Sequence, residues 1–238
     1  MLATSMETTN RAGALSADVH VPATFILELL DFICNELPRW RDRPDRAVET
    51  AETILTSQLC AHLNSAARHA AGWDILQFRV EEPDESHKNR KIDLVPAPCG
   101  ATICIEGRSY TDFDYLFPIE CKRLPIPATA DRDEREYVIS KHSSTGGIQR
   151  FKAGHHGSNY NMGAMIGYVQ EGTITSWYSQ IAGWIIDLVN AREPNWTVDD
   201  QLQLDSNDQK QRLAILNSSH TRKGSLPITL RHFWLEMN

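Results

Sequence analysis

The segment Ile119-Glu120-Cys121-Lys122 carries two side chains of opposite charge inside an otherwise apolar stretch. Alternate side chains of a β-strand point to opposite faces of its sheet. We therefore expect Ile119 and Cys121 to face the core and Glu120 and Lys122 to share the other face. A carboxylate of this kind holds a cation, and a neighbouring ammonium positions a water or offsets negative charge that develops during phosphoryl chemistry.

A second lone acid, Asp93, lies in the earlier apolar segment KIDLV. The intervening residues are enough for one strand and its turns, so Asp93 and Glu120 are expected to meet across a sheet. Two converging carboxylates repel each other unless a cation lies between them, and an oxygen site with few protein ligands suits Mg²⁺, with Mn²⁺ as a substitute. The main-chain carbonyl of Cys121 is a further candidate metal ligand.

An E-x-K triplet alone is weak, because about one is expected by chance in a chain of this size. The alternative is a half-exposed strand with a Glu–Lys surface pair, which contributes little to stability. Asp208-Gln209-Lys210 has a similar spacing, but it lies in the polar stretch SNDQKQR. Glu120 and Lys122 differ because apolar strand residues surround them.

The remaining chain supplies elements that would position these residues. Apolar spacing predicts helices over 22–38, stopped by Pro38, and over 47–71. Strands are expected at 73–83, 91–98, 100–107, 117–125, 161–170 and 226–237, and further helices at 128–144 and 173–193, with 146–159 a short helix or turn and 195–211 a polar loop. The predicted fold is α/β (α+β), with a central mixed sheet of about four to six strands flanked by helices. Residues 1–20 are expected to form a mobile polar arm and 21–238 a single domain.

This order of elements resembles the PD-(D/E)XK phosphodiesterase superfamily, which has the restriction-endonuclease-like fold. Asp93, Glu120, Lys122 and an acid on the 47–71 helix carry the resemblance, which covers about residues 47–170. It implies that Asp93 and Glu120 bind metal and that Lys122 assists the water, as in a Mg²⁺-dependent DNA endonuclease. Ile92 stands where the signature has a proline.

The helix acid is either Glu52 or Glu49. Glu52 is preferred, because Ile54 and Leu55 place it near the buried edge of the predicted helix. The alternative is a solvent-facing glutamate, since Glu is rarely buried unless it is paired.

Polar residues after the motif are candidates for contacts with a phosphate backbone: Gln149, Arg150, Lys152 and His155. Arg150 and Gln149, between Gly147 and Gly154, are the preferred pair. An ordinary solvated turn explains the same residues about equally well.

The net charge of −7 argues against a nonspecific nucleic-acid coat protein, but not against an enzyme with a local basic face. Five cysteines without a C-x-x-C pair favour a reducing cytoplasm over a disulfide framework. The expected partner is DNA, with RNA left open; no membrane segment is expected, and a homodimer is compatible with duplex cleavage. Two alternatives remain: an HNH-type site at His155, His156 and Asn159, and an inactive nuclease-fold protein that serves as a nucleic-acid-binding or regulatory subunit.

Overall fold

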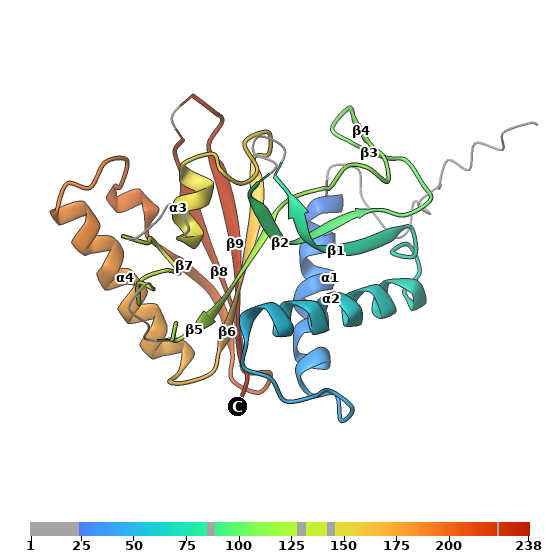
Figure 1. Ribbon diagram of the computed structural model, residues 1–238, viewed down its shortest axis with the longest axis horizontal. Helices are drawn as coiled ribbons and strands as arrows, with labels where there is room; N and C mark the ends of the chain where they lie inside the picture. The colour runs from blue at the N-terminus through green and yellow to red at the C-terminus, as the bar shows by residue number, and fades with distance from the viewer. Residues whose placement is uncertain (1–23, 85–88, 128–131, 142–145, 223) are drawn as a thin grey trace, which may run out of the picture.

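A mixed seven-stranded sheet with helices on both faces forms the centre of the computed structural model, which describes residues 24–84, 89–127, 132–141, 146–222 and 224–238. The sheet order is β1-β2-β5-β6-β9-β8-β7 (Figure 1). Its strands are β1 (Leu76–Pro83), β2 (Lys91–Pro98), β5 (Ile119–Leu124), β6 (Met162–Val169), β7 (Gln203–Asp208), β8 (Leu213–His220) and β9 (Ile228–Glu236).

The three central strands β5, β6 and β9 are parallel, and the flanking pairs are antiparallel. The architecture is therefore α+β, as predicted. The helices are α1 (Phe25–Arg41), α2 (Glu52–His69), α3 (Gly147–Lys152), α4 (Ile174–Asn190) and the short 3-10 helix η1 (Val198–Asp200). None of the described helices is long and apolar enough to cross a bilayer.

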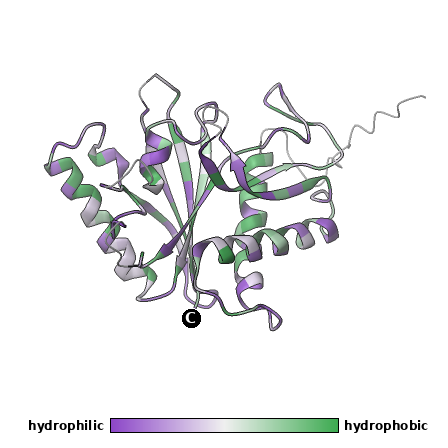
Figure 2. Cartoon of the chain, viewed as in Figure 1, coloured by the Kyte–Doolittle hydropathy of each residue, from purple (hydrophilic) through white to green (hydrophobic). Residues whose placement is uncertain are grey.

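Each face of the sheet has its own core. Ile119 and Cys121 of β5 belong to the cluster that packs against α1 and α2. Met165 of β6 and Ile181 of α4 belong to the cluster on the opposite face. Hydrophobic and hydrophilic residues alternate along α4, which suits a helix with one buried side (Figure 2). The alternation predicted for Ile119 to Lys122 is thus present.

The predicted count of four to six strands is wrong, because the sheet has seven. The stretch 195–211 was expected to be a loop, yet it contains β7, and β8 follows it. All but one of the β7 residues are exposed at the edge of the sheet, so its sequence lacks the apolar alternation that indicates a strand. The predicted strand 100–107 is instead part of a separate two-stranded hairpin, β3 (Ile103–Ile105) with β4 (Arg108–Tyr110).

Two predicted helix limits also differ. Pro38 does not stop α1, which continues to Arg41, because Trp40 is buried and Arg41 donates a hydrogen bond to the Gln211 carbonyl. Residues 132–141 of the helix predicted over 128–144 form turns, and their apolar members pack into the core beside α3 and α4. Residues 128–131 and 142–144, like the arm predicted over 1–20, lie outside the described residues.

Candidate active site

The candidate site lies where β2 and β5 separate. Among the described residues these strands share one register pair, Leu94 with Ile119. Beyond it, the main-chain N–H of Cys121 donates to Asp93 Oδ2 at 2.8 Å, and the N–H of Arg123 donates to Glu52 Oε2 at 3.0 Å. Two carboxylates therefore accept the hydrogen bonds that strand carbonyls accept in a continuous ladder. Both acids are held in place by the edge of β5.

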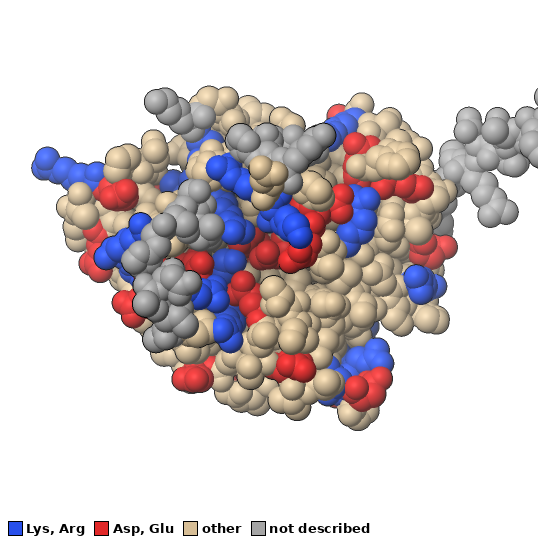
Figure 3. All heavy atoms as spheres, viewed as in Figure 1, with Lys and Arg blue, Asp and Glu red and all other residues tan. Residues whose placement is uncertain are grey.

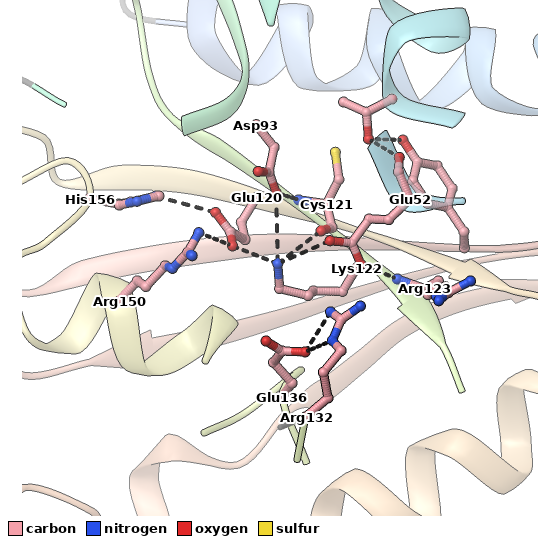
Figure 4. A network of polar contacts seen from close by, with 12 residues as sticks. Glu52, Asp93, Glu120, Cys121, Lys122, Arg123, Arg132, Glu136, Arg150 and His156 are labelled. Carbon is pink, nitrogen blue, oxygen red and sulfur yellow. Dashed lines mark hydrogen bonds and ion pairs between the residues drawn. The ribbon is translucent and has the colours of Figure 1, made fainter. Parts of the chain in front are cut away.

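The ammonium of Lys122 lies among these acids (Figure 4). Its Nζ is 2.8 Å from Glu120 Oε1, 3.4 Å from Glu52 Oε1 and 3.8 Å from Asp93 Oδ2. It also donates to the Cys121 carbonyl at 3.2 Å. We call Glu52, Asp93, Glu120, Lys122 and the Cys121 carbonyl the acidic site. The structure thus brings together the residues predicted for catalysis and metal binding.

Glu120 has two further neighbours from the segment that contains α3. Arg150 Nη1 donates to Glu120 Oε1 at 2.6 Å, and His156 Nδ1 lies 3.3 Å from Glu120 Oε2. Glu120 is fully buried, and its Oε2 makes no hydrogen bond within the described protein. Glu120 is therefore charged and enclosed, with one oxygen atom still available as a ligand.

The surroundings move the pKa values of these groups apart. Burial raises the pKa of Glu120, but the cations of Lys122 and Arg150 outweigh it, so the pKa lies well below its usual range. Burial and the charge of Glu120 raise the pKa of Asp93, even though 28% of that side chain is exposed. Burial lowers the pKa of Lys122, while Glu120 and Asp93 more than reverse this effect. The site therefore holds ionised Glu120 beside a permanently charged Lys122.

Charged groups of both signs lie together on the face seen in Figure 3. In Figure 3, acidic side chains collect near the centre of the view, with lysines and arginines on either side. In the acidic site, three carboxylates face the cations of Lys122 and Arg150. When Asp93 is ionised, the three carboxylates exceed these two cations by one negative charge, which is the electrostatic setting that attracts a metal ion.

The donor atoms of the acidic site fit Mg²⁺, which prefers carboxylate and carbonyl oxygens. The buried Oε2 of Glu120, whose contact among the described side chains is His156 at 3.3 Å, supports this fit. The described residues contain no group of three or more His, Cys, Asp or Glu side chains already arranged to hold an ion. The Lys122 ammonium is in contact with the oxygens that such an ion would use, so Lys122 would have to shift for an ion to bind.

The structure brings Glu52, rather than Glu49, to Lys122. Helix α2 begins at Glu52, and Glu49 lies ahead of the helix. In this first turn, the Glu52 carboxylate also interacts favourably with the helix dipole. Cys121 is fully buried, as predicted, and burial raises the pKa of its thiol well above the usual range.

Of the four predicted phosphate-binding residues, Arg150 contacts the acidic site directly. Arg150 bonds Glu120, whereas the Gln149 side chain accepts hydrogen bonds from the N–H groups of Gly146 and Ser140. Lys152 is buried in an ion pair with Asp200 at 2.5 Å, so it does not present its charge to a ligand. His155 is partly buried in the turn that follows α3.

A second cluster of polar side chains is buried between β8, which carries Ser218 and His220, and η1, which carries Asp200. Ser218 Oγ lies 2.7 Å from His220 Nε2, and His220 Nδ1 lies 2.6 Å from Asp200 Oδ1. These are hydrogen-bond distances of a Ser-His-Asp triad. However, Ser218, His220 and Asp200 are each at most 4% exposed, and Ser218 Oγ also contacts His232 Nε2 at 2.7 Å. With no access for a substrate, we assign this network a structural role.

The contact between His156 and Glu120 was not predicted, although His156 was named within the HNH alternative. A buried histidine beside a carboxylate leaves no periodic signal in a sequence. Comparison of the chain with protein-family models, curated proteins and solved structures finds no match. The geometry of the acidic site therefore carries the functional argument.

Proposed function

We propose that this protein is a Mg²⁺-dependent nuclease that hydrolyses phosphodiester bonds, most simply those of DNA. One observation carries the proposal: Lys122 Nζ lies within 3.8 Å of three carboxylates and one main-chain carbonyl. A surface Glu–Lys pair would be exposed, whereas Lys122 is 4% exposed and Glu120 is fully buried. Enclosing this much charge is unfavourable for folding alone, which favours a role in chemistry.

The topology supports the resemblance to the PD-(D/E)XK superfamily. An acid in the first turn of α2 precedes β2 with Asp93 and β5 with Glu120 and Lys122, and the sheet is mixed. We infer a restriction-endonuclease-like fold from this order. The hairpin of β3 and β4, inserted between β2 and β5, explains the long sequence gap between Asp93 and Glu120.

Each residue has a distinct proposed role. Asp93, Glu120 and the Cys121 carbonyl are the ligands for the ion, and Glu52 adds a carboxylate at its edge. When bound, Mg²⁺ supplies Lewis acidity toward a phosphoryl oxygen and the attacking water. Lys122 donates a hydrogen bond to that water or to the non-bridging oxygen that gains negative charge in the transition state.

The test compares cleavage of plasmid DNA, single-stranded DNA and RNA with Mg²⁺, with Mn²⁺ and with chelator. We expect cleavage only with a divalent ion, and a loss of at least a hundredfold in rate for Glu120→Gln and Lys122→Met. Lys91→Met is the matched control, because Lys91 forms an exposed pair with Glu81. Equal cleavage by the wild type and Glu120→Gln would refute the assignment.

One observation favours the non-enzymatic alternative: Lys122 and Arg150 already supply Glu120 with two positively charged partners. An inactive binding or regulatory subunit would bind nucleic acid but would leave all three substrates intact under every metal condition. Titration with Mn²⁺ separates the two functions further, because an inactive subunit does not require the ion. Metal binding that is lost in Asp93→Asn supports the nuclease.

A further inference from the structure

Arg150 and Lys122 contact the same oxygen of Glu120 from different elements. Arg150 Nη1 lies 2.6 Å from Glu120 Oε1, and Lys122 Nζ lies 2.8 Å from it. Glu120 is fully buried, so water does not screen its charge. The two cations therefore stabilise this carboxylate.

The two cations differ in their freedom to move. Lys122 belongs to β5, and 5% of its side chain is exposed. Arg150 belongs to the short helix α3, and 19% of its side chain is exposed. A partly exposed arginine can turn toward solvent without a change in the main chain, and its planar guanidinium binds phosphate well. Lys122 can shift only within the enclosed site, whereas Arg150 can leave Glu120 and find a new partner beside the site.

We propose that Arg150 is the counter-ion of Glu120 in the metal-free protein, that a divalent cation displaces it, and that the released guanidinium then binds a phosphate of the polynucleotide. This inference rests on the metal site of the proposed function. It assigns Arg150 two successive partners, and it makes the binding of metal and of substrate mutually dependent. Linkage requires that each ligand strengthens the binding of the other by the same factor.

Mn²⁺ binding to the substrate-free protein, measured by calorimetry, tests the first step. A charge-assisted hydrogen bond has to be broken before the ion binds, so Arg150→Gln should bind Mn²⁺ roughly ten- to a hundredfold more tightly than the wild type. Arg150→Lys retains the charge and should stay close to the wild type. Arg132→Gln is the control for loss of a nearby charge, because Arg132 pairs with Glu136 rather than Glu120 (Figure 4).

The outcomes separate this inference from the proposed function. Equal Mn²⁺ affinity of Arg150→Gln and the wild type overturns the displacement of Arg150 and leaves the metal site intact. An equal gain in Arg132→Gln also overturns it, since a general change in charge would then explain the result. Absence of Mn²⁺ binding in every variant overturns the displacement and the proposed metal site together.

Binding of a short duplex DNA with Ca²⁺ and with chelator tests the second step. Ca²⁺ takes the same oxygen ligands. Arg150→Gln should weaken DNA binding at least fivefold with Ca²⁺ but leave it unchanged with chelator, where Arg150 remains on Glu120. The same loss under both conditions, or no loss with Ca²⁺, would overturn the transfer of Arg150 to phosphate.

Discussion

Replacement of Lys122 by methionine removes the cation that Glu52, Asp93 and Glu120 share. Methionine has nearly the length of lysine, so the main effect is the loss of the ammonium. Glu120 is fully buried and keeps Arg150 as a charged partner, but the shared cation at 2.8 Å is gone. The three carboxylates then repel one another without the charge that separates them.

Removing one partner of a buried ion pair destabilises a protein by about 3–5 kcal/mol. Because Lys122 is only 5% exposed on its side chain, solvent screening reduces this figure little. For a chain of this size, about 1 kcal/mol shifts the thermal midpoint by about 2–4 °C. Lys122→Met is therefore expected to unfold some 6–20 °C below the wild type in chelator.

A divalent ion should reverse part of this loss. Mn²⁺ at about a hundred times its dissociation constant stabilises the folded state by about 2.7 kcal/mol. The gain should be larger in Lys122→Met than in the wild type, because the ammonium no longer competes for the same oxygens.

Thermal unfolding followed by circular dichroism, with chelator and with Mn²⁺, measures both effects. Lys91→Met is the control, since its exposed pair with Glu81 should contribute at most about 1 kcal/mol. Equal midpoints for Lys122→Met and Lys91→Met would refute the view that Lys122 neutralises buried charge. A Mn²⁺ shift no larger in Lys122→Met than in the wild type would refute the competition between the ammonium and the ion.

Three further predictions concern the rest of the fold. Burial lowers the pKa of His232 from 6.5 to about 3, so between these pH values the unfolded chain binds one more proton than the folded protein. The free energy of unfolding should therefore fall by up to about 1.4 kcal/mol per pH unit as the pH drops from about 6.5 toward 3. Urea titrations of His232→Gln should show a shallower dependence of this free energy on pH. Asp200→Asn leaves the buried Lys152 ammonium without its carboxylate and should lower the free energy of unfolding by about 3–5 kcal/mol, whereas a change below about 1 kcal/mol would contradict the buried pair. Gly167→Ala would place a Cβ 2.6 Å from the Trp234 ring and should lower the free energy of unfolding by about 1–3 kcal/mol. Gly183→Ala lies in α4 with open space around the new Cβ, and should raise this free energy by up to about 1 kcal/mol. Chemical denaturation that gives changes of the same sign for both variants would contradict this contrast.

The predicted placement of Glu120, Lys122 and Asp93 followed from strand alternation. The period of a strand fixes which residues share a face, so Glu120 and Lys122 could be placed together before any fold was known. Asp93 needed one more assumption, that its strand lies next to β5, and the sheet order fulfils it. Local patterns therefore identified the residues that the structure brings together in the acidic site.

The fate of Lys152 shows what local patterns miss. Among Arg150, His155 and other polar residues, Lys152 resembled a phosphate ligand. Its partner Asp200 lies far along the chain, in a segment expected to be a loop. Only the tertiary arrangement decides which acidic side chain meets which basic one. For the same reason, the sequence did not predict the hydrogen bonds that link Asp200 through His220 to Ser218.

Among the described residues, the side of β5 from which β2 separates lacks a continuous ladder of strand hydrogen bonds. Asp93 and Glu52 accept the hydrogen bonds of the two N–H groups on this side and place negative charge beside it. Because β5 is buried between β2 and β6, loss of both carboxylates would leave these two N–H groups without acceptors inside the protein, which should lower the free energy of unfolding.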